Sequence, residues 1–114
     1  MDEYIDEGEL SILLKAVCDS TRRSLLTLLC QQGPTRVTDL AKCYDLSLNA
    51  ISKHIKILEK SGLVIRKTIG RTHWIEADLN RTVLMEEWLN SLKSIWALRL
   101  DKLEQLLNNG EKND

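Results

Sequence analysis

The stretch LAKCYDLSLNAISKHIKILEKSGLVIRKTIGRTHWIEA, residues 40–77, determines the architecture of this chain. It starts within a short amphipathic helix, whose apolar residues recur at helical spacing from Val37 and which Thr35 is expected to cap. The polar turn Asp45-Leu46-Ser47 follows, and Ser47 can cap a second, lysine-rich helix. That helix is expected to end at Gly62, because glycine suits the left-handed position after a helix.

Two segments rich in β-branched residues follow, at positions 64–69 and 72–77, and they flank Gly70-Arg71. This pattern predicts a β-hairpin. Two helices joined by about three residues form a helix-turn-helix unit, and a hairpin after it forms a wing. The predicted fold class is therefore mostly α with a small β-hairpin wing, a winged helix-turn-helix of the kind that docks on duplex DNA.

Three further helices are predicted around this unit, which gives about five in all. Leucines at helical spacing predict one helix over 10–18 and another that residues 19–21 can cap and Pro34 ends. A last helix is predicted over 81–107, a segment without glycine or proline. The predicted organisation is an acidic flexible leader at 1–9, a winged helix-turn-helix domain at 10–107 with a C-terminal dimerisation helix, and a polar tail at 108–114.

Charge is distributed unevenly along the chain. The formal net charge is only -1, with 16 Lys and Arg against 17 Asp and Glu. Between residues 52 and 75, however, the six basic residues are opposed by Glu59 alone, whereas the first nine residues hold five acids and no base. This distribution gives a nearly neutral protein one positive face and predicts local phosphate binding.

Length and composition are typical of one soluble globular domain, with 114 residues of which 43% are hydrophobic. No apolar run approaches the ~20 residues of a membrane helix, and an acidic N-terminus is unlike a signal peptide. We therefore expect a cytoplasmic protein without membrane contact. A Gly-rich phosphate loop, a nucleophile elbow and a metal-binding motif are all missing, so an enzyme is the least favoured class and no cofactor is expected.

The lysine-rich helix divides into an apolar face and a polar face when its residues are placed about 100° apart. On the polar face, Asn49 can pair with an adenine edge, and Lys53 can donate to guanine acceptors in the major groove. Ser52 can reach a base or a phosphate. Lys56 and Lys60 lie farther along the helix and suit phosphates.

Taken alone, these lysines would be interpreted as a solvated face, as most helix lysines are. The capped helix, the basic hairpin and the near absence of acid in the same region make phosphate binding the favoured interpretation. Arg71 at the hairpin tip is placed to enter a neighbouring minor groove. His54 lies on the flank of the helix, where a half-buried structural role is favoured over base contact and a contact to the DNA backbone is the open alternative. The predicted DNA-binding residues are Ser47, Asn49, Ser52, Lys53, His54, Lys56, Arg66, Lys67 and Arg71.

Several motifs in order resemble the ArsR/SmtB family of bacterial repressors over roughly residues 10–107. They are Cys18-Asp19-Ser20-Thr21-Arg22-Arg23, Asp39-Leu40-Ala41, Leu46-Ser47, Ile51-Ser52-Lys53-His54-Ile55, Gly62-Leu63-Val64 and Gly70-Arg71. Their combination is more specific than any one of them. The resemblance implies a homodimeric winged-helix repressor that binds a palindromic operator, often near its own gene, and releases it when an inducer arrives.

The inducer sites of that family do not carry over to this chain. Many members bind metal through two cysteines at the start of the helix before the turn, where this chain has Arg36 and Thr38. Another site uses Asp and His ligands on the last helix, but His54 and His73 both lie outside it. Members that respond to sulfur or oxidants carry a cysteine in that helix, which here has none. The resemblance therefore favours the subgroup without a recognised inducer site, and no metal is expected.

Self-association is predicted from the apolar residues of the first and last helices. These helices carry more apolar surface than a small winged core can cover, and removing it from water at about 25 cal/mol per Å² favours a dimer. A two-fold dimer sets two recognition helices about 34 Å apart, so the operator should be an inverted repeat. The residues expected at the dimer interface are Leu10, Leu13, Leu14, Val17, Trp88, Leu92, Trp96 and Leu103.

The cysteines leave one alternative function open. Cys18, Cys30 and Cys43 are odd in number and lack C-x-x-C spacing, so buried reduced thiols are expected rather than disulfides. A thiol-based redox-responsive repressor remains an alternative to a plain repressor. A second alternative is a winged-helix module that contacts proteins and not DNA. The cluster of Lys53, Lys56 and Arg71 is the feature that distinguishes DNA binding from protein contact.

Overall fold

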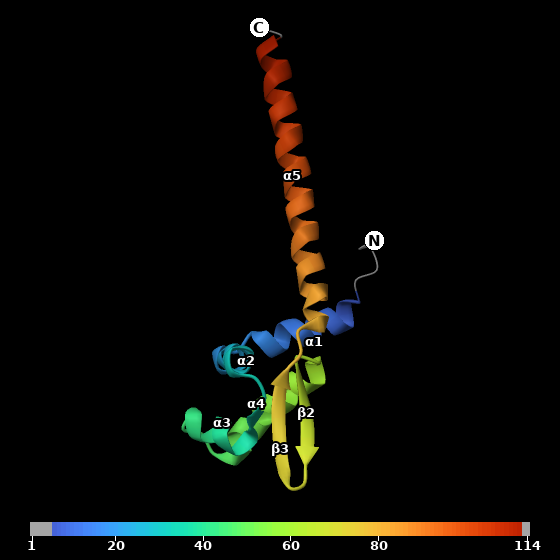
Figure 1. Cartoon of the computed structure of the whole chain (residues 1–114). Coiled ribbons are helices and arrows are strands. Elements are labelled where there is room, and N and C mark those ends of the chain that lie inside the picture. The colour runs from blue at the N-terminus through green and yellow to red at the C-terminus, as the bar shows by residue number, and fades with distance from the viewer. Residues whose placement is uncertain (1–5, 113–114) are drawn as a thin grey trace.

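The computed structural model describes residues 6–112, in which five α-helices and one small sheet make up the fold (Figure 1). This composition confirms the predicted mostly helical, winged helix-turn-helix architecture. Within this range, no helix combines the length and the apolar character needed to span a bilayer. In chain order the elements are α1 (Glu7–Val17), α2 (Ser20–Gln32), β1 (Thr35–Arg36), α3 (Val37–Cys43), α4 (Leu48–Ser61), β2 (Val64–Ile69), β3 (Thr72–Ala77), the 3₁₀ turn η2 (Asn80–Thr82) and α5 (Val83–Lys112).

Helix α1 begins at Glu7, earlier than the predicted start at Leu10. Asp6 is its N-cap, and the Asp6 carboxylate accepts a hydrogen bond from the backbone N–H of Glu9 at 3.1 Å. Glu7 and Glu9 also place negative charge at the positive end of the helix dipole. The prediction of a flexible leader over 1–9 is therefore wrong for residues 6–9, and its remaining residues, 1–5, lie outside the described part of the chain.

Helices α3 and α4 form the helix-turn-helix unit. Ser47 is confirmed as the N-cap of α4, since its hydroxyl accepts a hydrogen bond from a backbone N–H of the first turn at 3.1 Å. Asp45 turns the chain between the helices with a left-handed backbone, φ 51°, a conformation that Asp adopts more readily than most residues. Gly62 ends α4 at φ 81°, and the N–H of Leu63 donates to the carbonyl of Leu58 at 3.0 Å, as in a Schellman motif.

The predicted hairpin belongs to a three-stranded antiparallel sheet with the order β1-β3-β2. Strand β1 was not predicted, and in it Thr35 pairs with Ile75 of β3. The prediction that Thr35 caps α3 is wrong, because this pairing places Thr35 in β1, one residue before the N-cap position of α3. Arg36 occupies the N-cap position without a side-chain cap, and the Thr35 hydroxyl donates instead to the carbonyl of Gly33 at 3.0 Å.

One apolar core lies beneath the recognition helix α4. Helix α2 contributes Leu25, the sheet contributes Ile75, and α4 contributes Ile51, Ile55 and Leu58, all of them fully buried. The three α4 residues occupy the face that the helical wheel predicts to be apolar. The opposite face of α4 is consequently directed to solvent.

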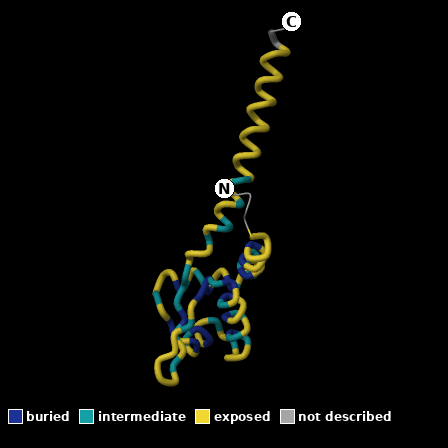
Figure 2. The backbone as a smooth tube through the Cα atoms, turned by 90° about the vertical axis from the view of Figure 1, so that its right-hand side faces the viewer, coloured by how far each residue is buried: buried dark blue, intermediate teal, exposed yellow. Residues whose placement is uncertain are grey.

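Helix α5 leaves this core and projects as a rod (Figure 1). It begins at Val83 and continues to Lys112, beyond the predicted end at Leu107. Residues 108–112 of the predicted polar tail are therefore helical, because no proline interrupts the helix and Gly110 costs only about 1 kcal/mol of helix propensity. Thirty residues of helix span about 45 Å, which gives the chain a long axis of 77 Å. Figure 2 shows that the distal part of the rod is exposed on all sides.

Candidate nucleic-acid interface

The polar face of α4 is open to solvent along its length. Asn49, Lys53, Lys56 and Lys60 are exposed, and Ser52 is half-buried among them. Within residues 6–112, no acidic side chain forms an ion pair with Lys53 or Lys56. Asn49 lies in the first turn of α4, which is the part of a recognition helix that meets base edges.

Ser47 has a structural duty in addition to its exposed position. Its oxygen accepts the capping hydrogen bond at the start of α4. A hydroxyl group also carries one hydrogen to donate, so Ser47 can still donate to a phosphate oxygen beside the helix start. Its role within the fold is to fix where α4 begins.

Arg71 lies at the tip of the wing. Gly70, with φ 63°, takes the first position of the two-residue loop between β2 and β3, as glycine does in tight hairpin turns. The Arg71 side chain is exposed, and none of the acidic side chains in the described range pairs with it. It is therefore a cation held away from the body of the domain.

The other two basic residues of the wing are engaged in ion pairs. Arg66 is half-buried and donates two hydrogen bonds to the Glu59 carboxylate of α4, at 3.0 and 3.3 Å. Lys67 Nζ lies 3.0 Å from an oxygen of Glu76 on the neighbouring strand. Both were predicted to bind DNA. The first pair attaches the wing to α4, and in both pairs the positive charge is offset within the fold.

His54 takes part in a polar network that joins α4 to the start of α2. Its Nδ1 lies 3.3 Å from Nη1 of Arg22, which can only donate, so this nitrogen accepts. Arg22 is 8% exposed and also donates to the carbonyls of Ala16 and Lys15 at the end of α1, at 2.7 and 3.1 Å. The interpretation of His54 as a half-buried structural histidine is confirmed. Sequence reasoning gave Arg22 no role, although it stands in the family motif at residues 18–23, within the first turn of α2.

Asp19 completes this network as the N-cap of α2. Its Oδ2 accepts a hydrogen bond from the backbone N–H of Arg22 at 3.0 Å and lies 3.9 Å from His54 Nδ1. The backbone hydrogen bond, together with the nearby positive charge of Arg22, holds the pKa of Asp19 below its usual value, against an opposing effect of desolvation. Asp19 is therefore poised to stay ionised next to the recognition helix.

A cleft of about 140 Å³ separates the start of α3 from the wing tip. Arg36, the N-cap of α3, and Thr38 line it from one side, and Arg71 and His73 line it from the wing. Arg36 is held by Asp39, whose carboxylate lies 2.9 Å from its Nε. The sequence analysis names Arg36 and Thr38 only because they occupy the positions of the family's two metal-binding cysteines. Their place beside the wing tip was therefore missed.

The predicted dimer residues separate into two groups. Leu10 and Leu13 of α1 are buried within the same chain, at 3% and 1% exposure, so their assignment to an interface between chains is wrong. They pack inward because α1 lies across α4 and α2 and closes the core. Of the remaining residues, Leu14, Val17 and Trp88 are half-buried, whereas Leu92, Trp96 and Leu103 on α5 are exposed.

The three cysteines differ from their predicted state. Cys18, Cys30 and Cys43 are free thiols, and all three are exposed rather than buried. Each lies at or near the end of a helix, outside the apolar stripe of that helix, which explains why the core does not take them up. Among residues 6–112, no group of three or more His, Cys, Asp and Glu side chains is arranged to hold a metal ion.

Comparison with known families and curated proteins gives a consistent result. Residues 19–66 match the model for bacterial regulatory proteins of the arsR family. The arsenical resistance operon repressor of Bacillus subtilis is 35% identical over 80 residues, which cover 70% of each chain. The transcriptional repressor SdpR of the same organism is 34% identical over 74 residues, which cover 65% of this chain and 79% of that one.

Solved structures extend the similarity beyond the helix-turn-helix unit. An ArsR-like transcriptional regulator from Rhodococcus sp. RHA1 superposes with a TM-score of 0.80 at 27% sequence identity. The match covers 90% of this chain and 93% of that one. The similarity therefore includes the wing and much of the last helix.

Proposed function

The chain belongs to the arsR family of bacterial regulatory proteins, and we propose that it represses transcription as a homodimer bound to an inverted-repeat operator. Membership makes it a DNA-binding transcriptional repressor. The assembly, the symmetry of the operator and the contacting residues are our additions. They rest on the surfaces of α4, the wing and α5.

The observation that supports the DNA contact is the row of exposed polar and basic side chains on α4 without acidic partners in the described range. With α4 in the major groove, Asn49 and Lys53 meet base edges, and Lys56 meets a phosphate. Arg71 at the wing tip then enters the adjacent minor groove. His54 and Arg66 act by holding α4 and the wing in position, and Lys67 acts by pairing with Glu76 across the two strands of the wing.

The homodimer is supported by the apolar stripe on α5. Leu92, Trp96 and Leu103 are 45%, 60% and 46% exposed, and they fall within about 40° of one another around the helix axis. A contiguous apolar surface of this kind on a single chain marks an association site. A second copy of α5 covers it in a two-fold dimer, which places two α4 helices on successive major grooves of an inverted repeat.

Salt-dependent DNA binding tests this proposal. The operator is first selected from genomic fragments with the purified full chain, and its affinity is then measured by fluorescence anisotropy over a range of salt concentrations. Lys56→Gln removes two phosphate contacts per dimer, so the slope of log affinity against log salt should fall by about 1.8. Lys102→Gln on the distal part of α5 is the matched control and should keep the slope. An unchanged slope in Lys56→Gln, or selection of no fragment, would contradict the proposal.

A second candidate is redox control of this repressor, which is favoured by the exposure of all three thiols. Exposed thiols are accessible to oxidants, unlike thiols in a core. Diamide treatment of the operator complex should then release DNA from the wild type and not from a variant with Cys18, Cys30 and Cys43 all changed to serine. Release from both proteins, or from neither, would contradict control through these thiols.

A further inference from the structure

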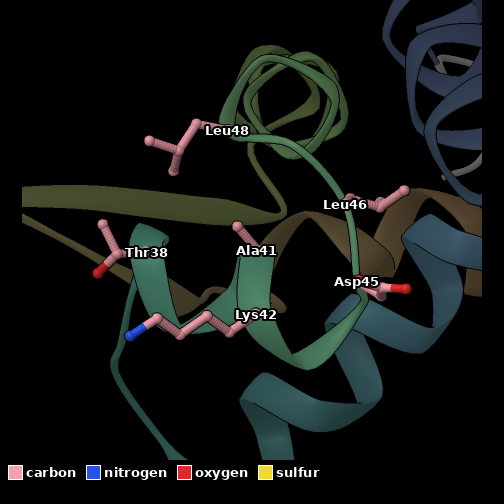
Figure 3. A pocket seen from close by; sticks show the side chains of 6 residues that line it. All are labelled: Thr38, Ala41, Lys42, Asp45, Leu46 and Leu48. Atoms are coloured by element: carbon pink, nitrogen blue, oxygen red, sulfur yellow. The ribbon is translucent and has the colours of Figure 1, made fainter.

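A notch of about 340 Å³ lies at the elbow between α3 and α4, beside the polar face of the recognition helix (Figure 3). None of the residues around it was predicted to contact DNA. It is formed by the exposed side of α3, the turn and the first residue of α4. The lining residues are Thr38, Ala41, Lys42, Asp45, Leu46 and Leu48.

Leu48 is the unusual residue of this notch. It is the first residue of α4 and is 53% exposed, although Ile51, Ile55 and Leu58 of the same helix are fully buried. Leu48 therefore contributes little to the core, and its δ-carbons stand at the end of α4 that enters a groove. Figure 3 shows the side chains of Leu48 and Thr38 on the same side of the notch, with the Ala41 methyl between the two helices.

The charges around the notch suit an approach of DNA from the side of Leu48. Figure 3 shows the Lys42 side chain extending toward that side, whereas the Asp45 carboxylate points to the opposite one. Thr38 lines both this notch and the cleft at the wing tip, where Arg71 lies. The notch thus adjoins the cleft that carries Arg71 of the wing.

We propose that this notch receives the C5-methyl group of a thymine in each half-site, with Leu48 as a specificity-determining residue. Thr38 and Ala41 complete the apolar contact. The proposal rests on the proposed function, since it requires α4 in the major groove. Thymine presents a methyl group there, and apolar side chains are the ones that read it. Lys42, at the mouth of the notch, is placed to meet a backbone phosphate nearby.

The contact has a defined size. Removing one methyl group from water stabilises a complex by roughly the amount for one buried CH₂, about 0.8 kcal/mol, which corresponds to about a fourfold change in affinity. The effect is local to one base pair in each half-site. It is therefore separable from the phosphate contact of Lys56, which acts on every sequence alike.

Uracil scanning of the selected operator tests the proposal. Each thymine is replaced in turn by deoxyuridine, which keeps the base pair and removes only the methyl group, and affinity is measured with the full chain. One position per half-site should lose affinity about fourfold with the wild type. Leu48→Ala should bind the thymine and uracil forms equally, and Leu48→Met, which keeps an apolar side chain of similar volume, should restore the difference. At the same position, a 5-methylcytosine·guanine pair presents the methyl group on a different base pair. Compared with an unmethylated cytosine·guanine pair, it should restore the apolar contact only.

The controls distinguish failure of this contact from failure of the function. Leu79→Ala removes an equally exposed leucine, 50% accessible, outside the helix-turn-helix unit, and should keep the thymine preference. Operator binding without any position sensitive to the methyl group would overturn the role of the notch and leave the repressor function intact. A methyl effect that persists in Leu48→Ala would assign it to another residue. If the chain binds no DNA at all, both the contact and the proposed function are wrong.

Discussion

The winged core and helix α5 are built from similarly leucine-rich sequence and use it in opposite ways. In the core, Leu25, Leu40 and Leu58 are completely buried by neighbours in the same chain. In α5, Leu98 and Leu106 are 65% and 67% exposed, and the rod extends into solvent. One region satisfies its own need for burial, whereas in the proposed dimer the apolar stripe of the other is covered by a second molecule. On that proposal, a small winged core is complete within one chain and its last helix joins two recognition helices.

A single large-to-small substitution should break the core most severely. Leu58→Ala leaves a cavity under α4, and the free energy of unfolding should fall by about 2–5 kcal/mol. Leu106→Ala, in the exposed rod, is the matched change and should cost a single chain less than about 0.5 kcal/mol. Urea denaturation at several protein concentrations measures both. Equal losses in the two variants, independent of concentration, would mean that α5 is packed within its own chain.

Charged substitutions on the rod should have the next largest effect. Trp96→Asp combined with Leu103→Asp places carboxylates in the apolar stripe of α5, and the dissociation constant of the dimer should rise at least about 100-fold, which corresponds to roughly 2.7 kcal/mol. Sedimentation velocity measures the monomer fraction. Asp substitutions at Ser94 and Asn108, on the other side of the rod, are the matched control. A wild-type chain that sediments as a monomer at micromolar concentration would contradict the dimer itself.

Local chemistry made much of the winged core predictable. Helix α4 begins after Ser47 and ends before Gly62, as expected, because a capping hydroxyl and a left-handed glycine act within a few residues of the chain. Strand β1 was missed because two residues carry no periodic signal, and only the pairing of Thr35 with Ile75 defines it. Leu10 and Leu13 were misassigned for a related reason: a helical apolar stripe indicates burial and does not identify the chain that provides it.

The candidate site was predictable where a residue's role depends on its own helix. The exposed face with Asn49, Lys53 and Lys56 follows from the period of α4 alone. Arg66 could not be placed in the same way, because its pairing with Glu59 joins two elements whose relative position the sequence does not display. Leu48 was overlooked because an apolar residue at a helix start is usually assigned to the core.

The smallest expected effect is on the stability of the fold at low pH, which we assign in part to the polar network of Asp19, Arg22 and His54. The pKa of Asp19 is lowered in the folded chain from its usual 3.8, so its stabilising contribution is present above about pH 4 and is lost as the pH falls through the lowered value. Asp19→Asn keeps a good N-cap but cannot ionise. The variant should therefore be slightly less stable than the wild type at neutral pH, and the difference should vanish under strongly acidic conditions. Thermal unfolding followed by circular dichroism from pH 7 to pH 2 measures this. If the two stability profiles stay parallel over that range, the ionised carboxylate beside Arg22 and His54 has no part in holding α2 against the recognition helix.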